Sequence, residues 1–246
     1  MLITSLLMSI NQLLPVVILW VLLHAIVKLS QKELVITLLA GLLSSFIYVH
    51  YAASISQLFD HRGVEFSQIA LCGIMFVAAL LACQQQRQGA VIAMISVMIV
   101  YLSHYMIYLI SFWQTNETAQ PLLIGTALGL GICFSFGTLF YFLLDGIKQR
   151  FGNLPLIILL AMNAAAKTLI ALDLASQIDL ANITASYVDW RGFLVENSEL
   201  GRVLKALIGY EATPSKTAIW LYTIAMSVFL FISWLLSKRN SVKEPI

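Results

Sequence analysis

Residues 90–113 of the chain read AVIAMISVMIVYLSHYMIYLISFW, and this stretch decides the fold. It carries no formal charge, and the nearest charged residues are Arg87 and Glu117. Because about twenty apolar residues suffice to cross a bilayer, the stretch predicts a transmembrane helix. His104 lies in its middle, with Tyr108 one helical turn further along the same face. An imidazole in hydrocarbon is costly, so we expect His104 to face a protein interior or a water-filled cavity.

The whole chain has the composition of a membrane protein. Of its 246 residues, 60% are hydrophobic and 11% are charged. The pattern predicts an all-α integral membrane protein with seven transmembrane helices in one membrane domain, 1–246. The predicted helices cover about 2–28, 34–57, 65–86, 90–113, 121–145, 154–180 and 216–237.

A polar segment, 182–215, separates the last two predicted membrane helices. It contains SELGRVLKALIG, whose apolar residues share one face, which predicts a short amphipathic helix at the membrane interface. Gly209 is placed to end that helix. Lysines and arginines are more frequent on the opposite side, at Lys28, Lys32, Arg87, Lys148, Arg150, Lys238, Arg239 and Lys243. This excess predicts an outer N-terminus and a cytoplasmic C-terminus.

Several functional classes find no support in the sequence. No basic run suggests nucleic acid, so the lipid bilayer is the expected surrounding. No nucleophile–base pair, phosphate-binding loop or metalloprotease spacing occurs, so we do not expect an enzyme.

The three cysteines, Cys72, Cys83 and Cys133, lie in apolar runs and are interpreted as buried free thiols. A compact chain without an organelle-type leader favours a bacterial inner membrane.

Polar residues inside the first and sixth predicted helices are candidate functional residues. Asn11 and Gln12 precede Pro15, and broken helices are tolerated where backbone lines a cavity. Amides that join packed helices are the alternative. Lys167 and Asp173 are intramembrane charges, six residues apart and therefore on different faces. Lys167 belongs either to a functional site or to a bond with another helix.

Two further patterns carry structural or chemical expectations. The turn DHRGVE places Asp60 and Glu65 close to His61, which predicts either a metal-recruiting group or a solvated loop of mixed charge. Gly125 and Gly129 have the spacing that allows close helix contact, as do the further glycines of that helix, Gly131 and Gly137.

The end of the chain resembles a known family. Residues 200–236 contain Gly209, Tyr210, Pro214 and Ser215, as in the Gly-Tyr-x-x-x-Pro-Ser/Thr segment before the last helix of the oxidase-dependent iron permease family. The DHRGVE turn is similar to that family's D-G-x-G-x-E turn. The resemblance covers nearly the whole chain and implies an inverted three-plus-three helix repeat followed by a C-terminal helix, with a transport site at the repeat interface.

The defining motif of that family, Arg-Glu-x-x-Glu, is absent at both of its positions. The first position has Asn11, Gln12 and Pro15, and the second has Ser103, His104 and Ile107. Desolvating Fe³⁺ without anionic oxygen ligands would be prohibitive. Gln12 and His104, with Tyr105, Tyr108 and Glu65, would suit a softer divalent ion.

Three hypotheses follow. The first is a divergent permease that moves a metal cation, with iron as the first candidate and no permanently bound cofactor. The ion would contact His104, Gln12, Asn11 and Tyr108, and Glu65 with Asp60 would recruit it. The second is a non-transporting membrane subunit that works with a periplasmic or membrane partner. The third is transport of another solute, with Lys167 binding an anionic group.

Overall fold

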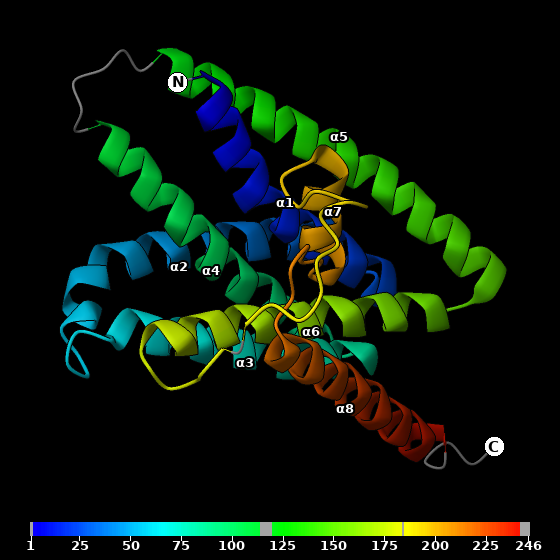
Figure 1. The fold of residues 1–246 in the computed structure, drawn as a ribbon. Coiled ribbons are helices and arrows are strands. Elements are labelled where there is room, and N and C mark those ends of the chain that lie inside the picture. The colour runs from blue at the N-terminus through cyan, green and yellow to red at the C-terminus, as the bar shows by residue number, and fades with distance from the viewer. Residues whose placement is uncertain (1, 114–119, 184, 242–246) are drawn as a thin grey trace.

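The computed structural model describes residues 2–113, 120–183 and 185–241, and it confirms an all-α protein (Figure 1). Seven long helices are apolar enough to cross a membrane. They are α1 Leu2–Val27, α2 Gln31–Ser56, α3 Gly63–Cys83, α4 Arg87–Trp113, α5 Gln120–Phe151, α6 Leu154–Gln177 and α8 Lys216–Ser241, and the short α7 is Glu199–Ile208. The described part contains an isolated bridge, Ser186 to Ser215, and no strand. Glu117 and Lys243 lie outside the described residues.

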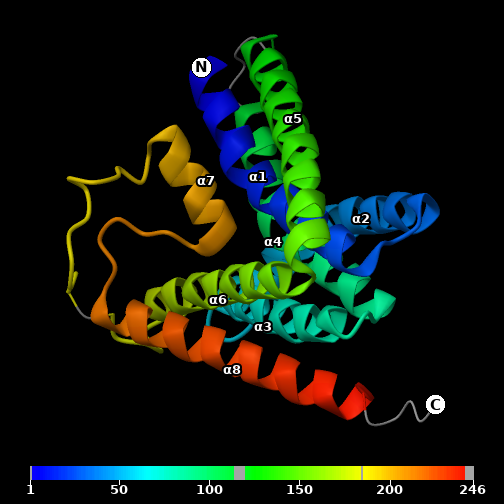
Figure 2. The ribbon, with the colours of Figure 1, turned by 90° about the vertical axis from the view of Figure 1, so that its right-hand side faces the viewer.

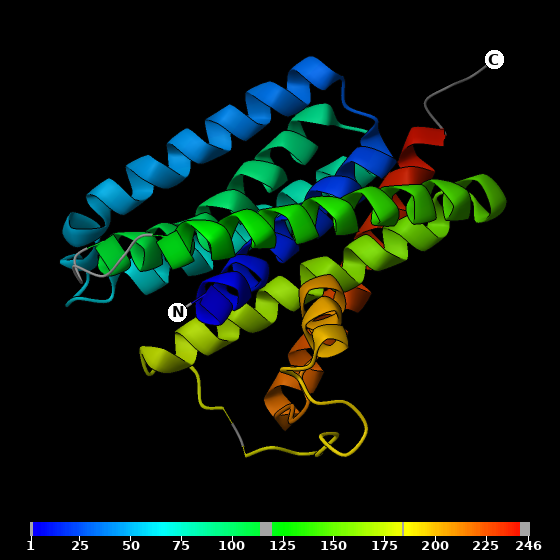
Figure 3. The same cartoon turned by 90° about the horizontal axis from the view of Figure 1, so that it is seen from above.

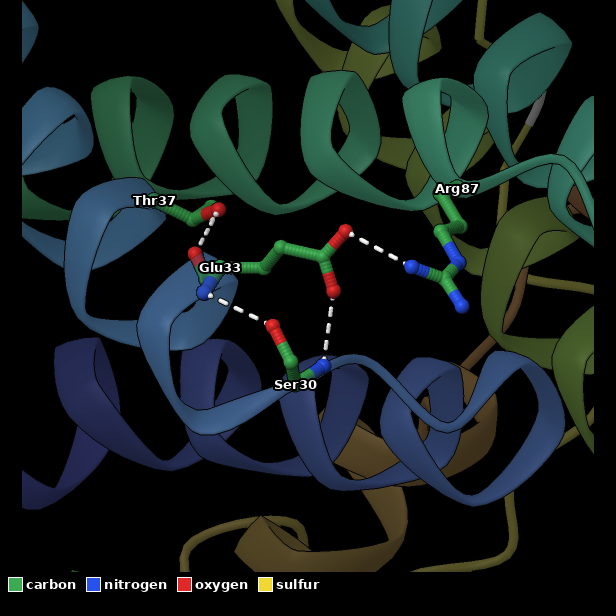
Figure 4. Close-up of polar contacts among 4 residues, drawn as sticks. All are labelled: Ser30, Glu33, Thr37 and Arg87. Carbon is green, nitrogen blue, oxygen red and sulfur yellow. Dashed lines mark hydrogen bonds and ion pairs between the residues drawn. The ribbon is translucent and has the colours of Figure 1, made fainter.

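Some helices extend further into polar sequence than the charge pattern predicted. α2 begins at Gln31 because Ser30 and Glu33 form a capping box, shown in Figure 4. The Ser30 side chain accepts from the Glu33 N–H at 3.3 Å, and Glu33 accepts from the Ser30 N–H at 2.7 Å. Arg87, the first residue of α4, pairs with the other Glu33 oxygen at 3.2 Å. The cap therefore holds the starts of two helices together.

The centre of the bundle is α1, which contacts α3, α4, α5, α6 and α7. Ile18, Leu19, Leu22 and Leu23 of α1 are fully buried in the core. α1 packs on α5, and α4 packs on α2 and α3. α6 lies against α3 and α8, as Figure 2 shows. Viewed from above in Figure 3, α2 lies on the opposite side of the bundle from α7.

The α1–α5 contact depends on small residues, as the glycine spacing predicted. A Cβ added at Gly125 would lie 2.7 Å from the Ser5 Cβ, and one at Gly129 would lie 2.5 Å from the Ser9 Cβ. Gly131 has no atom of another element within 4 Å of such a Cβ, so it does not take part in this contact. The Gly-xxx-Gly prediction is confirmed for the face that meets α1.

The short helix predicted in the polar segment is present as α7, and it packs against α1 and α6. Its last carbonyls, those of Ala206 and Leu207, accept hydrogen bonds from the Asn163 side chain at 3.0 and 2.8 Å. Asn163 is buried near the middle of α6. Gly209 ends α7 with a φ of 73° and lies so close to Ala166 that a Cβ would approach it to 2.6 Å. Small residues on α6 therefore let α7 enter the bundle.

Candidate functional site

A cavity of about 300 Å³ lies between α1, α4, α6 and α7. Its polar lining residues are Asn11, Gln12, Tyr101, His104, Glu196, Asn197, Arg202 and Lys205. Glu196 and Asn197 belong to the segment before α7, and Arg202 and Lys205 lie on α7 itself. The cavity is therefore closed on one side by the polar segment of the chain.

The cavity lies far from the helix ends along the bundle, and it is partly open, because Asn11 and His104 are exposed in it. Asn11 is nine residues from the start of α1 at Leu2, and His104 is nine residues from the end of α4 at Trp113. Ile170, another lining residue, is seven residues from the end of α6 at Gln177. At about 1.5 Å per residue these positions are roughly 10–14 Å from the helix ends. A hydrocarbon core is about 30 Å thick, so the cavity reaches membrane depth.

The structure brings together the polar residues that the sequence singled out on α1 and α4. Asn11, Gln12, Pro15 and His104 all line the cavity. Proline has no backbone N–H, so Pro15 leaves the Asn11 carbonyl without its usual partner in the helix. Asn11, which lines the cavity, thus carries both a side-chain amide and a carbonyl that lacks its helical partner.

His104 has a partner that the sequence did not indicate. The Gln68 side-chain nitrogen lies 3.2 Å from His104 Nε2, and Gln68 is buried on α3. An amide nitrogen only donates, so the neutral ring accepts at Nε2 and carries its hydrogen on Nδ1. The Nε2 lone pair is then used by Gln68, so a metal ion could bind His104 at this nitrogen only by displacing the Gln68 side chain. Gln68 is a lone polar residue in an apolar run, and nothing in the sequence connects it to α4.

Tyr108 lies away from the cavity, although it shares a helix with His104. Its hydroxyl is 3.2 Å from the Ser5 side chain on α1. The neighbouring Tyr105 hydroxyl is 3.0 Å from the Ser9 hydroxyl and donates to Thr126 of α5 at 2.7 Å. These contacts join α1, α4 and α5, so both tyrosines have a structural role.

The Asp60–Glu65 turn also lies apart from the cavity lining. Asp60 is exposed, and Glu65 is half-buried in the first turn of α3 with one buried oxygen that lacks a hydrogen-bond partner. Arg62 donates to the Ile178 carbonyl at 2.9 Å, at the C-terminal end of α6. Among the described residues, no group of three or more histidine, cysteine, aspartate or glutamate residues has the arrangement of a metal site.

Lys167 is buried, with 3% of its surface exposed. Its ammonium donates to the Tyr101 hydroxyl at 2.8 Å and lies 4.6 Å from the centre of the Tyr101 ring. The ion pairs of the described residues involve Arg87, Arg191 and Lys205, so Lys167 has no carboxylate partner there. Because Tyr101 lines the cavity, this buried charge lies directly behind the cavity wall.

A second group of charges lies at the end of α6. Lys205 pairs with Glu196 at 2.5 Å, and Glu196 also accepts from the Ala212 N–H at 3.5 Å. Burial raises the pKa of Glu211 above its usual value, the nearby carboxylates of Asp173 and Glu196 raise it further, and Lys205 opposes them. Asp173, the second predicted intramembrane charge, therefore belongs to this group and does not pair with Lys167.

Comparison with known proteins yields no relative, because no protein-family model, no curated protein and no solved structure matches the chain. The resemblance to iron permeases remains a prediction from the sequence. The functional argument therefore depends on the membrane fold and on the chemistry of the cavity.

Proposed function

We propose that this chain is a multi-pass membrane transporter that binds a small polar solute in the cavity between α1, α4, α6 and α7. The observation that carries the proposal is a cavity at membrane depth whose lining includes the polar side chains of Asn11, Gln12 and His104. Polar groups at that depth are expensive, and in membrane proteins they mark solute and ion pathways.

The packing of the helices supports a transporter built from an inverted repeat. In such a repeat, helices α1, α2 and α3 would correspond to α4, α5 and α6. The contact of α1 with α5 should then have a counterpart between α4 and α2, and the contact of α3 with α4 should have one between α6 and α1. All four contacts occur, whereas the contact between α1 and α3 has no counterpart between α4 and α6 in the described part of the chain. Inverted repeats bind their solute at the interface between the halves, where the first helices of both halves meet. Asn11 and His104 come from those two helices.

A metal cation is the second candidate cargo. The presence of Asn11, Gln12 and His104 in one cavity favours it, since these occupy the iron-permease motif positions. The single carboxylate of the lining, Glu196, is paired with Lys205. Fe³⁺ needs anionic oxygen ligands, so a softer divalent ion would be the cation to fit.

We further propose that the protein lies in a bacterial inner membrane with its N-terminus outside. The lysine and arginine distribution supports this orientation. The cavity, which lies toward the end where α1 begins and α4 and α6 end, would then open toward the outer compartment.

Uptake into proteoliposomes tests the proposal. We would compare Fe²⁺, Fe³⁺, Cu²⁺, Zn²⁺, inorganic phosphate and succinate for the wild type, Asn11→Leu and His104→Ala. We expect uptake of at least one solute, reduced at least tenfold by Asn11→Leu, because leucine removes an amide and fills the cavity. The control is Asn153→Leu, since Asn153 is exposed and makes no capping bond.

Failure to transport any of these solutes above empty liposomes, by protein shown to be folded, would contradict the proposal. That result would favour the alternative of a membrane subunit that acts with a partner. Equal loss of uptake in Asn11→Leu and Asn153→Leu would also count against this cavity as the solute site.

A further inference from the structure

The side chains that line the cavity carry more positive than negative charges. Arg202 and Lys205 are cationic, and Glu196 is the single carboxylate. Lys205 and Glu196 neutralise each other at 2.5 Å. Arg202 is half-buried and has no ion pair among the described residues. A guanidinium in this position lacks the planar, bidentate anion that it binds best.

Tyr101 adds a hydrogen-bond donor that a cation cannot use. The Lys167 ammonium donates to the Tyr101 oxygen at 2.8 Å, so the Tyr101 hydroxyl hydrogen is left to donate to another group. In the described part of the chain the Tyr101 hydroxyl has no acceptor. A hydroxyl polarised by a buried ammonium is a strong donor, and Tyr101 lines the cavity.

His104 contributes a second hydrogen-bond donor to the cavity. Because Gln68 donates to Nε2, the neutral imidazole presents an N–H at Nδ1. His104 and Tyr101 are three residues apart on α4 and both line the cavity. One helix face therefore supplies two donors, and α7 supplies the guanidinium across from it.

We propose that the cavity binds a small oxyanion, a carboxylate or a phosphate, through the Arg202 guanidinium, the Tyr101 hydroxyl and His104. The oxyanion also provides the counter-charge that buried Lys167 lacks, because it lies beyond the Tyr101 hydroxyl to which Lys167 donates. A buried charge such as the Lys167 ammonium is costly without a counter-charge. A bound anion would therefore stabilise the protein as well as being held by it. This inference names the cargo class of the proposed transporter and rests on that function.

The other carboxylates near this end of α6 do not oppose binding inside the cavity. Asp173 and Glu211 interact with Lys205 and Glu196, but neither lines the cavity. They reduce the positive potential around Lys205 from outside the lining, so they act on an anion only at longer range.

Calorimetric titration of the full chain in detergent tests the inference, with inorganic phosphate and succinate as probes. We expect saturable binding of at least one probe. Tyr101→Phe and Arg202→Gln should each weaken it about ten- to a hundredfold, since each removes a hydrogen bond to a charged group. The control is Arg191→Gln, because Arg191 is exposed in the outer segment and pairs with Asp189. Thermal unfolding of each variant shows that it is folded.

The two probes distinguish the source of the oxyanion, because preference for one identifies a phosphate or a carboxylate. Unchanged affinity in folded Tyr101→Phe and Arg202→Gln would overturn the inference, as would saturable Zn²⁺ binding with no binding of either anion. Metal uptake without anion binding would leave the transporter proposal intact and remove only this inference. Anion binding without transport of any solute would support this inference about the ligand and contradict the transporter proposal.

Discussion

The hydrogen bond from Gln68 determines which nitrogen of His104 can donate, and the sequence did not predict this contact. Asn11, Gln12 and His104 were recognisable because each is polar inside an apolar run, and the cavity joins them. The donors Tyr101 and Arg202 were not recognised, because a tyrosine in a membrane helix and an arginine on an amphipathic helix are ordinary. Their importance comes from Lys167 and from the docking of α7, which are contacts between residues far apart in the chain.

The raised pKa of Glu211 predicts a pH dependence of anion binding. As pH falls through that pKa, Glu211 gains a proton, and its repulsion of an anion that approaches the lining residue Lys205 is lost. Affinity for sulfate, which keeps its charge in this range, should therefore rise as the pH is lowered from neutral. Glu211→Gln should bind sulfate more tightly at pH 8 and show a smaller rise. Identical pH profiles for the wild type and Glu211→Gln would contradict this role.

At the scale of the helices, hydropathy predicted which segments form them, and caps and small residues determine how they end and pack. The start of α2 depends on Ser30 and Glu33, which a count of charges places outside the membrane helix. The position of α7 depends on Asn163 and on the close approach of Gly209 to Ala166. An amphipathic pattern alone cannot distinguish a helix on a membrane surface from one that docks into a bundle.

The α1–α5 contact gives a matched pair of substitutions. Gly129→Leu should destabilise the protein by about 1–3 kcal/mol, because its side chain would overlap Ser9. Gly131→Leu on the same helix should have little effect, since that position is open. Thermal unfolding in detergent, followed by circular dichroism, measures the difference. Equal stability of the two variants would show that α1 and α5 do not approach closely at Gly129.

At the scale of the whole molecule, the seven apolar helices were predictable because each is a long run with few charges. The cavity was not, since it forms only when α1, α4, α6 and α7 meet. The proposed repeat would exchange the α1–α5 contact for the α4–α2 contact, and both contacts occur. Such a repeat would bring the first helices of its two halves, α1 and α4, to one interface. The cavity lining combines neutral side chains with Arg202, Lys205 and Glu196, which is why we propose an anion and not Fe³⁺ as its cargo.

Thiol labelling at Asn11 tests the central claim most directly, namely that a solute site open to outside water lies inside the bundle. We would replace Cys72, Cys83 and Cys133 by alanine, introduce Asn11→Cys, and treat intact cells with a membrane-impermeant maleimide. Ile18→Cys, fully buried on the same helix, and Asn182→Cys, exposed in the segment before α7, are the controls. We predict labelling of Asn11→Cys and Asn182→Cys but not Ile18→Cys, with sulfate slowing the reaction only at Asn11→Cys. Labelling of Asn182→Cys alone would mean that the cavity is closed to outside water, and it would contradict the claim.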